Sequence, residues 1–173
     1  MRARVAYALG RLSIAAATPA LLRLLDDPDR RVRDQARDAL GSVGSPTAVD
    51  ALLAEASNQD PRLRAQAAKA LAKAADSDPR VAPRLMLLSQ DDDATVRAAT
   101  LSGLATVDDH SSRWAPLVAQ LANDPDPTVR QRVATVAHHL APNNVSDILR
   151  RLADDPDATV RQAAETQLNR LPK

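Results

Sequence analysis

The segment LANDPDPTVRQRVATV, residues 121–136, contains a pattern that recurs along the whole chain of 173 residues. Its centre is the pair Val129 and Arg130, and Asp126 lies four residues before that arginine. An aspartate, then a branched apolar residue and an arginine, returns every 31 to 33 residues, with the arginine at Arg33, Arg64, Arg97, Arg130 and Arg161. A period of this size is typical of solenoids, in which short structural units stack on one another.

Each unit is expected to fold as two helices joined by a tight turn. In the second helix, apolar or small residues lie one residue before the arginine and three, seven and ten residues after it, which forms one stripe along a helix. In the first helix, Glu55 interrupts a leucine column and predicts a local gap or an outward turn. Helices are therefore expected at about 1–12, 14–25, 30–43, 46–57, 61–75, 79–89, 94–106, 112–122, 127–140, 143–153 and 158–171.

The recurrent aspartate is expected to cap the second helix, because its carboxylate can accept backbone N–H groups that have no partner in the first turn. The arginine four residues later is expected to reach back to that aspartate or across to the turn of the next unit. We interpret these side chains as a structural ladder that sets the register of the stack, not as a binding site. The predicted ladder comprises Asp29, Arg33, Asp60, Arg64, Asp93, Arg97, Asp126, Arg130, Asp157 and Arg161.

Composition limits the classes of function. The chain has 23 basic and 22 acidic side chains, so strong long-range attraction to nucleic acid or to a membrane surface is not expected. Cysteine is absent, which excludes disulfides, thiolate nucleophiles and cysteine-based zinc sites and suits a reducing cytoplasm. No run approaches the roughly 20 apolar residues that a membrane span needs. Arg11 interrupts the apolar stretch near the start, which argues against a signal peptide.

The repeated motif resembles the HEAT repeat family. The pattern L-x-x-L-x-x-D-x-D-x-x-V-R-x-x-A is matched in the fourth full unit by Leu121, Asp124, Asp126, Val129 and Arg130, with Val133 at the alanine position. The prolines often found in the first helix of such repeats have counterparts in Pro19, Pro83 and Pro116. The ALG segments at 8–10 and 39–41 are similar to those of the phycobilisome-lyase-type HEAT-like subgroup.

This resemblance implies an all-α fold, a right-handed α-solenoid of HEAT-like helical hairpins whose second helices line the concave face. We divide the chain, as one domain, into an N-terminal half repeat at 1–12 and five full repeats at about 13–43, 44–75, 76–107, 108–140 and 141–173. The fold is shared by many unrelated scaffolds, so it predicts function poorly.

Candidate catalytic and metal sites are few. His138 and His139 are adjacent on a predicted helix and point about 100° apart, which is poor geometry for two ligands of one metal. The trio Asp108, Asp109 and His110 is interpreted as a polar turn, and Trp114 as a core residue. The turns hold twelve aspartates, which predicts an acidic ridge along one edge, but the spacing of a calcium-binding EF-hand is absent. We expect no catalytic residue, no cofactor and no metal.

The concave face is the expected binding surface, formed by the residues one, five and eight positions after each arginine. These positions are mostly small and uncharged, which suits an approaching helix or extended peptide, whereas a DNA duplex needs several Lys and Arg contacts to phosphates. A protein or peptide partner is therefore expected and nucleic acid is disfavoured; a non-binding face, with binding on an edge or terminus, stays open. The candidate binding residues are Asp34, Asp38, Lys69, Ser102, Gln131, Thr135 and Gln162.

The expected function is a non-enzymatic protein-interaction scaffold or a repeat segment of a larger protein. The alternatives are a nucleic-acid-binding or DNA-modifying module on the same fold, and a bilin-lyase-like protein. A second expected interface is the N-terminal edge, where Val5, Leu9 and Leu12 form an apolar stripe without a covering first helix. This edge predicts further repeats before it, self-association or a docking partner, because exposed apolar patches usually mark interfaces.

Overall fold

The computed structural model describes residues 1–107 and 112–171, and every regular element in these ranges is helical. Five even-numbered α-helices alternate with six odd-numbered ones over the described residues, and short 3₁₀ segments flank α2, α8 and α10. The α-helices are α1 (Arg2–Arg11), α2 (Thr18–Arg23), α3 (Arg30–Val43), α4 (Pro46–Glu55), α5 (Pro61–Lys73), α6 (Val81–Leu88), α7 (Ala94–Leu104), α8 (Ala115–Leu121), α9 (Pro127–Leu140), α10 (Val145–Ala153) and α11 (Ala158–Leu168). These bounds lie within a few residues of the expected ones.

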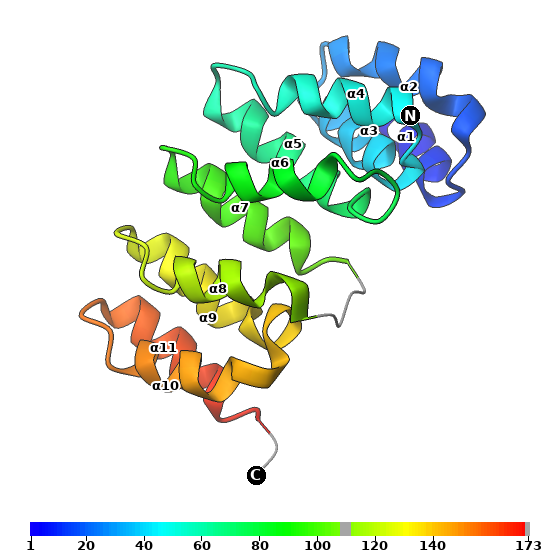
Figure 1. Cartoon of the computed structure of the whole chain (residues 1–173). Coiled ribbons are helices and arrows are strands. Elements are labelled where there is room, and N and C mark those ends of the chain that lie inside the picture. Colours follow the sequence, from blue (N-terminus) through cyan, green and yellow to red (C-terminus); the bar gives the residue numbers. More distant parts are fainter. Residues whose placement is uncertain (108–111, 172–173) are drawn as a thin grey trace.

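The helices form two layers that follow the order of the chain. Figure 1 shows the even-numbered helices side by side in front and the odd-numbered helices behind them, from the N-terminal to the C-terminal end of the stack. Each odd helix packs against the next odd helix and, from α3 onwards, against the even helix that precedes it. The chain is therefore an α-solenoid. We call the side of the odd helices that is turned away from the even helices the odd-helix face.

The predicted apolar columns form the core. The first-helix column is completely buried and consists of Leu21, Leu52, Leu85, Val118 and Leu149. The valines before the recurrent arginines are buried as well, namely Val32, Val96, Val129 and Val160. Because leucine, valine and alanine supply nearly all of this core, burial of aliphatic side chains is the main driving force for stacking.

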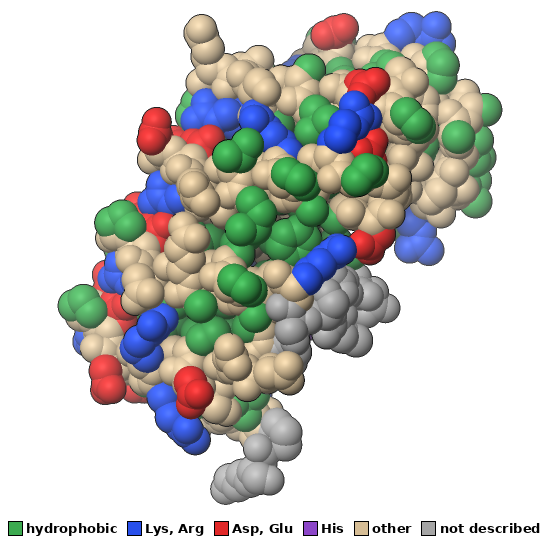
Figure 2. Space-filling view, in the orientation of Figure 1, with side chains coloured by type: hydrophobic (Ala, Val, Ile, Leu, Met, Phe, Trp, Pro, Cys, Tyr) green, Lys and Arg blue, Asp and Glu red, His purple; other side chains and the backbone are tan. Residues whose placement is uncertain are grey.

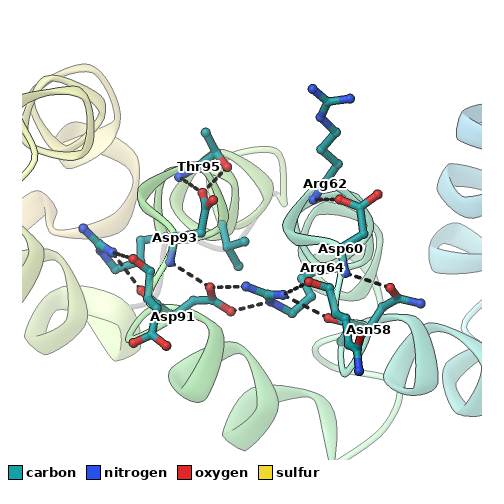
Figure 3. Close-up of polar contacts among 12 residues, drawn as sticks. Asn58, Asp60, Arg62, Arg64, Asp91, Asp93 and Thr95 are labelled. Carbon is teal, nitrogen blue, oxygen red and sulfur yellow. Dashed lines mark hydrogen bonds and ion pairs between the residues drawn. The ribbon is translucent and has the colours of Figure 1, made fainter.

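The five expected N-caps are present. The carboxylate of each recurrent aspartate accepts the backbone N–H of the second residue of its helix, as Asp93 does from Thr95 at 2.8 Å (Figure 3). Pro61 and Pro127 occupy the first helical position, where a missing N–H leaves no hydrogen bond unmade. The complete set of caps is Asp29, Asp60, Asp93, Asp126 and Asp157.

The residues eight positions after each arginine were expected to line the open concave face, but in the first units they do not. Gly41 and Ala72 are buried between adjacent odd helices instead of lining an open face. Their small size allows the helix backbones to approach closely, so this column belongs to the contact between units. In the last two units the same column is exposed, at His138 and Asn169.

Within the described ranges, none of the helices has both the length and the apolar character needed to cross a lipid bilayer.

Candidate protein-interaction surfaces

Bidentate ion pairs connect the turn of one unit to the turn of the next. Arg97 donates from Nε and Nη2 to the two carboxylate oxygens of Asp124, each at 2.7 Å. The same arrangement joins Arg64 to Asp91, as Figure 3 shows. Equivalent pairs are Arg2 with Asp27 and Arg130 with Asp155. Each arginine therefore reaches across to the next unit, and its partner is the aspartate two residues before the cap.

The remaining arginine nitrogen holds the turn of its own unit. Nη1 of Arg97 donates to the carbonyl oxygens of Asp91 and Asp92 at 2.7 and 3.1 Å. The partner carboxylate has a second role as well, because Oδ1 of Asp124 accepts the backbone N–H of Asp126 at 2.9 Å. The edge formed by these turns carries alternating Lys or Arg and Asp or Glu side chains in Figure 2. It is a mixed-charge edge, because the predicted acidic ridge is interleaved with the arginines that pair with it.

The ladder has a gap between the first two full units. Asn58 stands where the other turns have the partner aspartate, and its amide oxygen accepts only the Asp60 backbone N–H, at 2.9 Å. Arg33 keeps its bonds to the carbonyl oxygens of Asp27 and Pro28. The structure records no ion pair between Arg33 and this turn, which lies in the described part of the chain.

Filling this gap is expected to stabilise the protein. Asn58→Asp gives Arg33 a carboxylate partner like those of Arg64, Arg97 and Arg130, and the expected gain is about 1 kcal/mol because the pair is partly exposed. The reverse change, Asp124→Asn, keeps an acceptor for Asp126 but removes the charge facing Arg97, and should cost about 2 kcal/mol. Urea unfolding followed by circular dichroism measures both. Equal effects of the same sign in the two variants would show that charge pairing is not what the ladder contributes.

A second set of ion pairs lies at the same boundary. Nε of Arg37 donates to Oε2 of Glu55 at 2.7 Å, and Nη1 donates to Asp34 at 3.2 Å. The Arg37 side chain is only 5% exposed. Lys73 crosses the boundary to Asp38. The interruption of the leucine column by Glu55 is therefore neither a gap nor an outward turn; it is an inward pair between α3 and α4.

The candidate binding residues on the odd-helix face differ in whether their side chains already have a partner within the chain. Asp34 and Asp38 are half-buried and held by the pairs just described, which leaves them little capacity for a partner. Ser102 and Thr135 donate their hydroxyls to backbone carbonyls of their own helices. The others are exposed or half-buried, without such an internal bond in the described contacts: Lys69, Gln131 and Gln162.

The stripe predicted on α1 is exposed for two of its three members. Val5 and Leu12 are 47% and 67% exposed, whereas Leu9 is half-buried against the core. Tyr7 on the same helix and Met1 directly before it are exposed as well. By contrast, the side chains exposed on α11 are mainly polar, so the two ends of the described stack differ in chemistry.

The sequence pattern of HEAT repeats matches residues 1–72, 39–105 and 81–169. The chain belongs to the HEAT repeat family. A search of curated proteins by sequence gives no match. The structure resembles the complex of CpcE and CpcF of phycocyanin lyase from Nostoc sp. PCC7120, with a TM-score of 0.56, 24% identity, and coverage of 94% of this chain and 68% of that chain.

Two further solved structures share this HEAT-like architecture. Escherichia coli YibA has a TM-score of 0.61 and 20% identity, with 92% of this chain and 61% of that chain covered. Human deoxyhypusine hydroxylase in complex with glycerol has a TM-score of 0.52 and 21% identity, with 97% and 78% covered. At these identities the likeness shows the fold and leaves the activity of this chain open.

The predicted histidine pair and tryptophan have different surroundings in this HEAT repeat chain. His138 and His139 are exposed, and their ring centroids lie 3.8 Å apart. Partial desolvation of the His138 ring, followed by the neighbouring His139, lowers the pKa of His138.

Trp114 is buried, which confirms its assignment to the core, and the Arg113 guanidinium lies 4.8 Å from the centroid of its ring. Residues 1–107 and 112–171 contain no cluster of three or more potential metal ligands. The trio Asp108, Asp109 and His110 lies outside the described residues.

The ladder arginines and Arg2 lower the pKa of the aspartates that pair with them. Hydrogen bonds from the partner guanidinium are the largest cause, and they hold the pKa values of Asp27, Asp91 and Asp155 below the usual range for aspartate. Outside the ladder, hydrogen bonds from Arg80 lower the pKa of Asp78 to about 2.

Acid is therefore expected to lower the melting temperature between about pH 4 and about pH 2. The unfolded carboxylates bind protons near pH 3.9, whereas the folded ones bind them only at lower pH, so in this window the unfolded state holds more protons and stability falls as the pH falls. Thermal melts followed by circular dichroism measure this. Asp91→Asn should show a smaller acid loss than the parent, and Asp92→Asn, at a neighbouring exposed carboxylate outside the ladder, should not. A melting temperature constant down to pH 2 would contradict the linkage.

Proposed function

We propose that this HEAT repeat chain is a non-enzymatic protein-interaction scaffold, alone or as the repeat segment of a larger protein. The proposal includes a protein or peptide partner and a cytoplasmic location, for which the absence of cysteine is the supporting observation.

This proposal rests on a difference between the turns and the odd-helix face. Most charged side chains that recur at the turns already have a partner within the chain, whereas several polar side chains on the odd-helix face have none. At the turns, the ladder arginines, the aspartates that pair with them and the capping aspartates are bound to one another or to backbone groups, and exposed carboxylates such as Asp92 are the exception. On the odd-helix face, Arg62, Gln66 and Lys69 have no hydrogen-bond or ion-pair partner for their side chains among the described residues. Unpaired polar groups on a rigid element can contact a partner without first breaking internal bonds, which favours binding.

The test is affinity capture from an extract of the source cells, followed by mass spectrometry, with the parent chain and two surface variants. One variant carries Arg62→Glu and Lys69→Glu on the odd-helix face, and the other carries Val5→Lys and Leu12→Lys at the N-terminal edge. A stoichiometric protein partner that is lost with one variant and retained with the other supports a scaffold. Sequence-selective DNA binding tighter than the ~10⁻⁶ M limit of non-specific contacts at physiological salt would instead favour a nucleic-acid module.

A further inference from the structure

We propose that the odd-helix face around α5 binds an extended acidic segment of a protein partner, with carboxylates spaced three residues apart. This inference rests on the proposed scaffold function and specifies the chemistry of its partner. The site consists of two adjoining depressions of about 490 and 180 Å³ that flank the first half of α5 and share Arg30, Arg62 and Gln66. Together we call them the α5 hollow; it extends from α3 across α5 to the start of α7.

The α5 hollow has unpaired positive charge. Five cationic and three anionic side chains line it. The anionic ones are already engaged, since Asp34 pairs with Arg37 while Asp60 and Asp93 cap helices. Arg62 and Lys69 are exposed and have no such partner in the described structure. A ligand with carboxylates therefore meets free cations, and complementary charge both attracts it and fixes its register.

Arg62 is oriented for such a contact. Its backbone N–H binds the Asp60 cap, while its side chain extends away from the ladder contacts in Figure 3. Arg64, two residues further on, points into the ladder and is bound to Asp91. Although these two arginines are close in the sequence, the Arg64 side chain forms an ion pair within the ladder, whereas the Arg62 side chain is free to contact a ligand.

The spacing of the free cations sets the spacing of the ligand. Arg62 and Lys69 are seven residues apart on one helix, so a rise of 1.5 Å per residue separates their Cα atoms by roughly 10 Å. In a polyproline II segment, three residues per turn and a rise of 3.1 Å place every third side chain on one face, about 9 Å apart. Two carboxylates three residues apart can therefore pair with Arg62 and Lys69 at the same time.

The residues between these cations suit a peptide backbone. Gln66 lies one turn from each of them and is half-buried, and its side-chain amide offers two donors and an acceptor. A polyproline II backbone has no internal hydrogen bonds, so its N–H and C=O groups are available to that amide. Ala65, which lines the hollow, is small enough to let the peptide approach closely.

The same surface is poorly suited to nucleic acid. Single strands are held by aromatic side chains on which bases stack, and the two aromatic residues of this chain are Tyr7 on α1 and Trp114, which is buried. A duplex requires several phosphate contacts in a row, but from α7 onwards most residues that continue this face are uncharged, such as the exposed Thr128 and the half-buried Gln131, and Arg132 is a single exposed cation on α9. The observations therefore favour an acidic peptide.

The test is fluorescence anisotropy with the purified chain and three short labelled peptides. The first has glutamate at every third position among Ser, Ala and Pro; the second has the same composition with the glutamates adjacent; the third has lysine in place of glutamate. The first peptide is expected to bind most tightly, and its affinity should fall when salt is raised to ~150 mM, where charges are screened over about 8 Å. The third should show no saturable binding.

A matched pair of variants locates the site. Arg62→Glu should weaken binding of the first peptide by about five- to tenfold, the effect of reversing one partly exposed ion pair. Arg132→Glu makes the same charge change at an exposed site on α9 and should leave the affinity within about twofold. With α7 between α5 and α9 and neighbouring helix axes about 8–10 Å apart, this site is separated from Arg62 by about twice the screening length of about 8 Å. Both side chains are exposed, so thermal melts should match the parent.

The outcomes separate this inference from the scaffold proposal. Equal weakening by Arg62→Glu and Arg132→Glu, or equal affinity for the spaced and clustered peptides, would show diffuse attraction and overturn the α5 hollow. Tighter binding of oligothymidine than of the acidic peptide, lost with Arg62→Glu, would overturn it in favour of nucleic acid. Partner capture that persists in the Arg62→Glu and Lys69→Glu variant would refute peptide binding at the α5 hollow, and the scaffold proposal would still stand.

Discussion

Replacing Gly41 with valine is expected to lower the free energy of unfolding by about 3 kcal/mol or more, at the upper end of what overpacking costs. A Cβ atom at Gly41 would lie 2.2 Å from the carbonyl oxygen of Ala70 and 2.8 Å from its carbonyl carbon. Both are backbone atoms of α5 and cannot rotate away, so α3 and α5 must separate. Because the core is continuous across this boundary, the separation also exposes neighbouring aliphatic side chains. Urea unfolding measured by circular dichroism gives the loss.

The matched control for this prediction is Ala105→Val. Ala105 occupies the same position relative to its arginine as Gly41, but it is half-buried at the C-cap of α7, whereas Gly41 is buried. Its replacement should cost less than about 1 kcal/mol, as exposed or adaptable sites usually do. Similar losses in the two variants would mean that the close approach of α3 and α5 is not the cause.

The elements and caps were predictable because their causes are local. Asp93 and the N–H groups that it caps lie within one helical turn, and the apolar stripe around Val96 follows from the helical period alone. Interactions whose partners lie within about ten residues of each other can be predicted from the sequence without knowing how the units pack.

The partners of the ladder arginines were not predictable in the same way. Arg97 and Asp124 are 27 residues apart, and their meeting depends on the offset between stacked units. Four of the five turns offer two or three aspartates, and the sequence does not distinguish the one that caps from the one that pairs. The D-x-D spacing was the available signal, and the replacement of its first member by Asn58 marks the one interrupted step in the described ladder.

Small residues gave an ambiguous signal for the odd-helix face. Gly41 and Ala72 fit an open surface that receives a ligand, and they fit equally well a close contact between helices. Only the distance between neighbouring helices decides between the two, and that distance is a property of the stack. The free cation Arg62 was missed for a related reason, since it lies before the arginine from which the predicted face was counted.

The boundary without a ladder pair has an ion pair in its core instead, and this predicts strong coupling between Arg37 and Glu55. Glu55→Leu alone should cost about 3 kcal/mol, because it leaves the 5% exposed Arg37 side chain with Asp34 as its remaining partner. Arg37→Leu alone should cost a similar amount, because it leaves the Glu55 carboxylate, 19% exposed, without its cation.

The double variant Arg37→Leu and Glu55→Leu is expected to recover most of that loss. The other full units have leucine at the position of Glu55. The position of Arg37 is occupied by Ala68, Leu101 and Ala134 at the boundaries that follow, and by Glu165 in the last unit, so the stack accommodates an apolar pair at its other boundaries. Replacing a buried ion pair by apolar side chains is often neutral or stabilising. The double-mutant cycle should therefore give a coupling energy of about 2 kcal/mol or more. Losses that simply add would mean that Arg37 and Glu55 act independently, and that this boundary is held together by the contact at Gly41 and the pair between Lys73 and Asp38.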